Sequence, residues 1–147
     1  MKLTFPWSLI VAVQFSGVGA PLAQEVNPAT LYELSTEGSS QKVRSGSKGI
    51  MVLAIRTKDG SHVSSEAPFK LELSGKGVKP EKEKVALAEA VSKKSVPAGF
   101  ADPRFEVPFT AESVGKAKLD ARLTFFICTV KVCARQQRTL SVPVEVE

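Results

Sequence analysis

The sequence contains few of the residues that usually build catalytic or metal centres. Its 147 residues include one histidine, His62, and two cysteines, Cys128 and Cys133. A zinc site needs four protein ligands, or three and a water molecule, so these residues would have to recruit carboxylates to form one. The sequence therefore predicts no metal site. His62 follows a turn and is expected to be an exposed loop residue.

Motifs of the common enzyme classes are also absent. No serine lies in a nucleophile elbow, and Gly75-Lys76-Gly77 lacks the spacing of a phosphate-binding loop. Lysines between positions 76 and 94 are mixed with glutamates, which is typical of a solvated face. We therefore expect no cofactor, and whether the chain is an enzyme depends on its two cysteines.

Long apolar runs are absent except near the N-terminus. Lys2 precedes a mostly apolar stretch over residues 3–19, and small residues lead up to Ala23. This order is typical of a secretory signal peptide cleaved after Ala23. A retained membrane anchor is the alternative, but the run is short and interrupted by polar residues. We expect loss of residues 1–23, leaving residues 24–147 as one exported domain that does not insert into a membrane.

Export changes the net charge little. Removal of Lys2 leaves 19 basic and 15 acidic residues, a net charge of +4. This charge favours acidic partners. Nucleic-acid binding would need a dense basic face with interleaved aromatic residues, and the only tryptophan, Trp7, lies in the predicted signal peptide. The composition predicts no nucleic-acid partner.

Strand-like segments alternate with turn residues from Thr30 onward. Residues 69–73 alternate apolar and charged side chains, as a half-buried strand does. Pro108 is expected to confine its strand to a sheet edge or a bulge. These patterns predict an all-β fold, an antiparallel β-sandwich of about seven short strands. The clearest strands are expected over residues 30–34, 50–57, 69–73, 105–110, 118–128 and 139–146.

Residues 80–94 (PEKEKVALAEAVSKK) conflict with this picture. Strong helix formers follow Pro80, and acidic residues precede basic ones, which favours a helix. The alternative is an extended segment with Val85 and Leu87 facing inward, because propensity is a weak guide inside a sheet protein. The residues alone leave both possibilities open.

The last two strands place both cysteines on one face. A strand alternates faces with period two, so apolar residues at odd positions 119–127 face the core and Cys128 points outward. The even positions 140–146 form the core side of the last strand. Cys133 is at an odd position, so it is expected to point outward as well. Residues 129–132 between the cysteines have a common hairpin length. We therefore predict a cross-strand disulfide, Cys128–Cys133.

Two roles for this disulfide remain open. As a structural staple it closes a short loop, which restricts the unfolded chain by about 2 kcal/mol. As a redox-active pair it would exchange with a partner's thiol, because an exposed sulfur at a hairpin tip permits in-line attack. The nearby Lys131, Arg135 and Arg138 would favour a thiolate in the reduced state.

Four segments of the chain, taken in order, resemble the N-terminal periplasmic domain of the thiol:disulfide interchange protein DsbD. They are residues 59–62 (DGSH), residues 65–71 (SEAPFKL), residues 105–109 (FEVPF), and residues 123–133 (LTFFICTVKVC) followed by residues 140–146 (LSVPVEV). The resemblance covers most of residues 49–147.

The resemblance implies an immunoglobulin-like sandwich in the periplasm. Cys128 and Cys133 would accept electrons from a membrane electron transporter and pass them to oxidised proteins. It also implies a cap loop over the cysteine pair, for which Phe100 and Asp102 are candidates, and an extended segment after Pro80. Ordinary core or loop packing is the alternative for Phe100.

The chain also departs from this family. Ala134 and Arg135 follow the second cysteine where the family often has aromatic residues or proline, and the 147 residues contain no segment similar to the family's membrane-spanning or thioredoxin-like parts. We therefore expect either that a separate membrane protein serves the domain or that only the scaffold remains. The two hypotheses are an exported thiol–disulfide carrier and a non-catalytic immunoglobulin-like binding module with a structural disulfide.

Overall fold

The computed structural model describes Gly17, Gly19 and residues 26–147. Apart from the two glycines, the predicted signal peptide over residues 1–23 lies outside the described residues. The described part forms eleven strands and two short 3-10 helices. They are η1 (Pro28–Thr30), β1 (Tyr32–Ser35), β2 (Lys42–Val43), β3 (Lys48–Thr57), β4 (His62–Ser64), β5 (Lys70–Lys76), β6 (Val78–Pro80), β7 (Lys84–Val85), η2 (Leu87–Glu89), β8 (Ser92–Val96), β9 (Gly99–Ala111), β10 (Gly115–Cys128) and β11 (Cys133–Val146).

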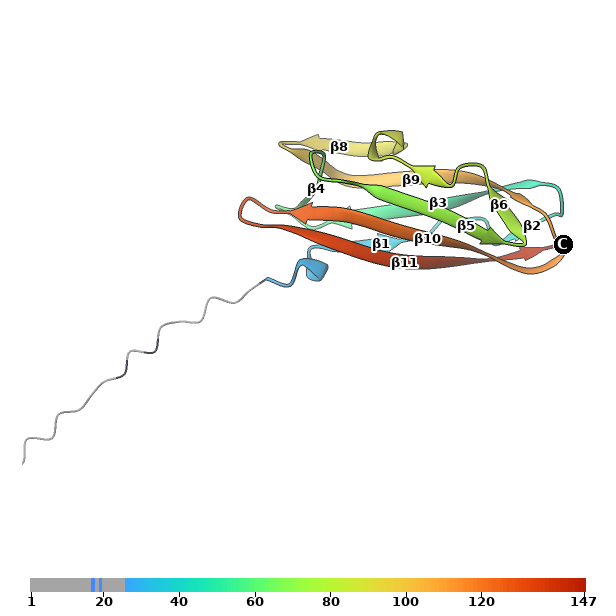
Figure 1. Cartoon of the computed structure of the whole chain (residues 1–147), viewed down its shortest axis with the longest axis horizontal. Helices are drawn as coiled ribbons and strands as arrows, with labels where there is room; N and C mark the ends of the chain where they lie inside the picture. The colour runs from blue at the N-terminus through green and yellow to red at the C-terminus, as the bar shows by residue number, and fades with distance from the viewer. Residues whose placement is uncertain (1–16, 18, 20–25) are drawn as a thin grey trace, which may run out of the picture.

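The strands form two sheets packed face to face (Figure 1). One sheet has the order β1–β3–β9–β8, and in the other β10 lies between β5 and β11. This is the A-B-E-D and C-F-G order of constant-type immunoglobulin domains, so the predicted immunoglobulin-like sandwich is confirmed. Seven main strands match the predicted number. The short strands β2, β4, β6 and β7 come in addition to them.

Two short strands modify the sandwich. β2 pairs with β11 in parallel, so the expectation of a purely antiparallel fold is wrong for this pair. β4 pairs with β9 of one sheet and with β10 of the other, which makes the hydrogen bonding continuous through a single curled sheet. β4 therefore joins the sheets at the end of the sandwich where β10 ends.

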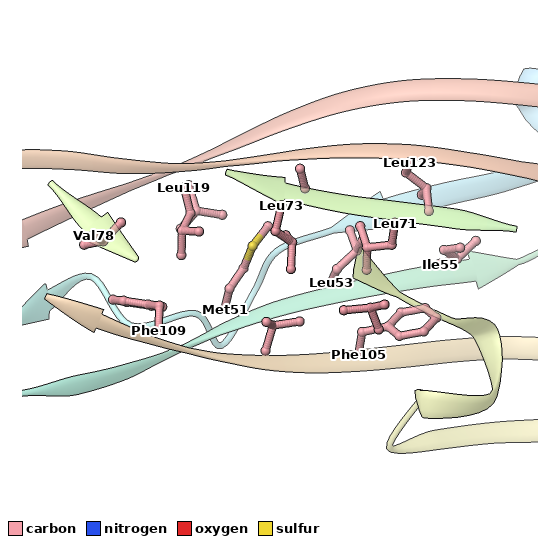
Figure 2. Packing of buried hydrophobic residues seen from close by; sticks show 14 of the residues in the cluster. Met51, Leu53, Ile55, Leu71, Leu73, Val78, Phe105, Phe109, Leu119 and Leu123 are labelled. Atoms are coloured by element: carbon pink, nitrogen blue, oxygen red, sulfur yellow. The ribbon is translucent and has the colours of Figure 1, made fainter. Parts of the chain in front are cut away.

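The core lies between the two sheets. Figure 2 shows Leu119 and Leu123 of β10 pointing toward Met51 and Leu53 of β3. The predicted inward parity of β10 is confirmed, because its inward residues are almost completely buried. Burial of such side chains is the main force holding the two sheets together. Other buried residues include Ile55, Leu71, Leu73, Phe105, Val107, Phe109, Ala121, Phe125, Ile127, Val142, Val144 and Val146.

The segment over residues 80–94 is extended except for one 3-10 turn. Lys84–Val85 form β7 against β5, and Leu87–Glu89 form η2 before β8 begins. Val85 and Leu87 are both buried, as the extended alternative predicted. Tertiary burial of these two side chains outweighs the helix propensity of their neighbours.

Pro108 lies inside a central strand, so the expectation of an edge position is wrong. β9 pairs with β3 on one side and with β8 and β6 on the other. Pro108 falls between the residues that pair with β8 and those that pair with β6, and its carbonyl accepts a hydrogen bond from the Glu81 amide (2.9 Å). A missing N–H is tolerated there because neither short strand reaches it.

A polar contact links the outer faces of β10 and β11. The Ser141 hydroxyl donates a hydrogen bond to the carboxylate of Asp120, its partner in the strand register. This bond and the nearby Lys118 ammonium lower the pKa of Asp120, while desolvation acts in the opposite direction. The hairpin that ends in the cysteines is therefore tied on its outer face as well as by its core residues.

Candidate functional site: the disulfide at the end of the β10–β11 hairpin

Cys128 and Cys133 form a disulfide where β10 ends and β11 begins. Their sulfurs are 2.05 Å apart, their Cα atoms are 4.1 Å apart, and the two residues are register partners. The Thr129 amide donates to the Val132 carbonyl (2.7 Å), so the cysteines form the next, non-hydrogen-bonded pair, in which strands approach most closely. The pairing predicted from strand parity is confirmed.

The two cysteines differ in exposure. Cys128 is only 2% exposed, whereas Cys133 is exposed. The sequence predicted both sulfurs on an open outer face, and this is wrong for Cys128. β4 lies against the end of β10 and places His62 directly opposite Cys128. Cys133 is on β11, which lacks such a neighbour at that point within the described residues.

The loop between the cysteines presents apolar side chains to solvent. The Thr129 hydroxyl accepts hydrogen bonds from the amides of Lys131 and Val132 (both 3.2 Å), which fixes the turn locally. Val130 is 99% exposed and Val132 is 47% exposed. Two exposed valines beside an exposed cysteine form a small apolar tip that another macromolecule can contact.

The cations near the pair fall into two groups. Lys131 and Arg135 are exposed, and neither forms an ion pair with another described residue. Arg138 is instead held by Tyr32, whose hydroxyl accepts a hydrogen bond from its Nε (2.8 Å) and donates one to Gln136 (3.0 Å). Lys131 and Arg135 are therefore the predicted electrostatic neighbours that remain available to a partner.

Phe100 does not form part of a cap loop. It lies in β9, paired with Val63 of β4 and Ser95 of β8, and the Lys93 ammonium lies 5.0 Å from its ring centroid. The register places Phe100 on the face of Val63 and Ile127, opposite to the face of Cys128. The chain reverses direction in a tight turn at Pro97 and Ala98, where Ala98 has a φ of 64°. β9 therefore begins at Gly99, and Phe100 lies in this strand instead of in a loop.

Asp102 forms a link between strands. Its carboxylate accepts hydrogen bonds from the Thr57 amide (2.8 Å) and hydroxyl (3.3 Å), at the point where β3 ends. Its φ of 49° accompanies an irregularity in the β8–β9 pairing. Asp102 therefore fixes the end of the sandwich around the site without covering the disulfide.

His62 is the site residue that the sequence analysis missed. It is half-buried in β4, whereas a loop position was expected. A side chain at Gly99 would place its Cβ 2.1 Å from the Val63 carbonyl oxygen and 2.6 Å from Cδ2 of His62, so the glycine permits the close approach of β4 to β9. A three-residue strand has too short a pattern to identify from sequence.

A hollow of about 350 Å³ opens at this end of the molecule. His62, Asp102 and Val130 line it, together with the turn over residues 58–61 and the β8–β9 hairpin. Figure 1 shows these chain turns at the same end of the sandwich as the β10–β11 turn. The described residues contain no cluster of three or more potential metal ligands, and none of their helices is long and apolar enough to span a membrane.

The fold and its disulfide define an all-β, immunoglobulin-like domain with a cross-linked terminal hairpin. No family model and no curated protein matches the chain. One similar solved structure is the crystal structure of domains 4 and 5 of the S-layer protein SbsC, with 16% identity and a TM-score of 0.32. The match covers 78% of this chain and 51% of that one. The chain thus spans about half of that structure, and so weak a likeness indicates nothing about function.

Proposed function

We propose that the domain exchanges electrons with protein partners through the Cys128–Cys133 disulfide. The observation that carries this proposal is the unequal exposure of the pair, with Cys133 open to solvent and Cys128 buried beside β4. Exchange requires in-line access to one sulfur only. The four segments that resemble the DsbD N-terminal domain, in the same order along the sequence, support the same role. They favour the periplasm as the compartment and a membrane electron transporter as one partner.

The exchange balances without any further reactant. A partner thiolate attacks Sγ of Cys133, the new S–S bond forms as the Cys128–Cys133 bond breaks, and the electron pair leaves on the sulfur of Cys128. A second thiolate of the partner then attacks the partner's own sulfur and releases Cys133. The partner leaves with a disulfide and the domain leaves with two thiols. The reverse sequence reduces an oxidised protein.

The surrounding residues suit these steps. Lys131 and Arg135 favour the thiolate form of Cys133 and an approaching anionic partner. His62 is the register partner of Cys128, so its side chain lies on the same side of the strands as the sulfur that leaves first. As a staple, by contrast, the bond closes only a short loop between strands that are already paired along their whole length, and its contribution of about 2 kcal/mol is modest.

The second candidate function is a binding module in which the disulfide is structural. The position of Phe100 favours it, because no aromatic residue from that segment shields the bond as the resemblance implies. In that case the exposed valines of the loop are the contact surface and the disulfide fixes their position.

The rate of reduction of the folded protein separates the two functions. We expect dithiothreitol to reduce the native disulfide within about tenfold of the rate in guanidinium, because Cys133 needs no unfolding to be attacked. Circular dichroism should show that the reduced domain stays folded. Reduction slower than in guanidinium by about a thousandfold would indicate a bond that opens only on unfolding, and would favour the binding module.

A further inference from the structure

We propose that the open edge of β11 binds an extended, acidic, cysteine-bearing segment of the partner by strand addition. This rests on the proposed function and specifies its substrate. The partner segment pairs with β11 from Cys133 toward Ser141, and its cysteine lies opposite Cys133. Backbone pairing would supply affinity, and the charge of Arg135 and Lys131 would supply the preference for acidic segments.

The edge is unpaired along most of its length. β11 pairs with β10 throughout, but on its other side it pairs with β2 only at Glu145 and Val146. Within the described residues no strand pairs with residues 133–144 on that side. An open edge of this length is a template for another strand.

The backbone direction can be derived from two hydrogen bonds. The Thr129 amide bonds to the Val132 carbonyl, so Cys133 belongs to a pair whose backbone groups point away from β10. With period two, the same holds for the odd positions that follow. The Glu145 amide confirms this parity by donating outward to the Gln41 carbonyl (2.8 Å). The outward donors are the amides of Cys133, Arg135, Gln137, Thr139 and Ser141.

The chain itself shows that this edge accepts a strand and where the free part ends. β2 already occupies Glu145 and Val146 in parallel. Pro143 has the outward parity but no N–H, so an added strand loses a bond there. One carbonyl of the edge already has a hydrogen-bond partner, because the side-chain amide of Gln136 donates to the Arg135 carbonyl (2.9 Å) at the surface.

The geometry at Cys133 suits chemistry from this side. The disulfide runs from β11 to β10, so in-line attack on the sulfur of Cys133 comes from beyond the β11 edge. A residue opposite Cys133 in an added strand would have its Cα at about 5.5 Å, within the range of a disulfide. The mixed disulfide would thus form between register partners, with the electron pair leaving on Cys128.

The test compares Gln137→Pro with Gln137→Ala in the full chain. Proline removes one outward N–H, while alanine keeps it, and neither change touches the pairing with β10. The probe is a peptide of about nine residues that carries a cysteine at the end expected to lie opposite Cys133 and alternates valine and glutamate over the rest. A second peptide carries serine in place of that cysteine, and a third carries lysine in place of glutamate.

We expect Gln137→Pro to weaken binding of the serine peptide, and to slow exchange with the cysteine peptide, by about tenfold, while Gln137→Ala changes neither. Reduction by dithiothreitol should be the same in all three proteins. Arg135→Glu should weaken binding of the glutamate peptide and favour the lysine peptide, which keeps the proposal testable if the proline variant is unstable.

Equal binding by the proline variant and the wild type, or no binding of the glutamate peptide by the wild type, would overturn strand addition. The charged residues and Pro143 would then serve only to prevent edge-to-edge association. Failure of dithiothreitol to reduce the native bond would instead contradict the proposed function. The serine peptide still decides strand addition in that case, because its binding involves no exchange.

Discussion

The free thiol of Cys133 in a Cys128→Ser variant is expected to react with an aromatic disulfide reagent at least about a hundredfold faster than the thiol of Cys128 in a Cys133→Ser variant. Cys133 is exposed to solvent, as are the neighbouring Lys131 and Arg135, so the reagent can reach its sulfur in the folded protein. Cys128 is 2% exposed and covered by β4, so its reaction requires β4 to move away first. A hundredfold difference corresponds to an opening free energy of about 2.7 kcal/mol.

The two single-cysteine variants are controls for each other. Both lack the disulfide and carry one conservative change, so loss of the cross-link affects their stability equally. In guanidinium their thiols should react at similar rates. Equal rates in the folded proteins, or a faster Cys128, would show that burial beside His62 does not direct attack to Cys133.

Replacing Phe125 with alanine is expected to lower the free energy of unfolding by about 3–5 kcal/mol, a large part of the stability of a small domain. Phe125 is completely buried and packs edge-to-face against Tyr32, with ring centroids 4.9 Å apart. Truncation leaves a cavity between β10 and β1 and removes this aromatic contact. Urea unfolding followed by circular dichroism measures the loss.

The neighbouring Phe126 supplies the matched control. It lies on the outer face of the same strand, opposite Arg135, and is only half-buried. Phe126→Ala should cost less than half as much as Phe125→Ala, because it removes less buried surface and opens no internal cavity. A similar loss for both variants would mean that the strand does not alternate as the structure has it.

Strand periodicity predicted most of the fold and the cysteine pair. The alternation along residues 118–128 is long enough to assign core residues such as Leu123 and Phe125, and both are buried. The same parity placed Cys128 and Cys133 on one face, where they are register partners. These predictions succeeded because each rests on many residues of one uninterrupted strand.

The surroundings of the pair were not predictable in the same way. β4 has only three residues, and its position depends on pairing with β9 and β10, which are far from it in the sequence. The local sequence therefore gave no indication that Cys128 would be buried beside His62. Phe100 was expected in a cap loop because the resemblance implied such a loop just before residues 105–109, whereas β9 already begins at Gly99 and pairs with β4 and β8. Long-range pairing, which sequence periodicity does not report, decided both outcomes.

The reduction potential of the Cys128–Cys133 pair tests the central claim most directly. Equilibration of the folded protein with glutathione redox buffers, followed by alkylation and mass spectrometry, gives this value. An exchanging pair should lie above about −300 mV, within reach of other thiol–disulfide proteins. A potential below about −300 mV would mark a structural disulfide and contradict the proposed exchange function.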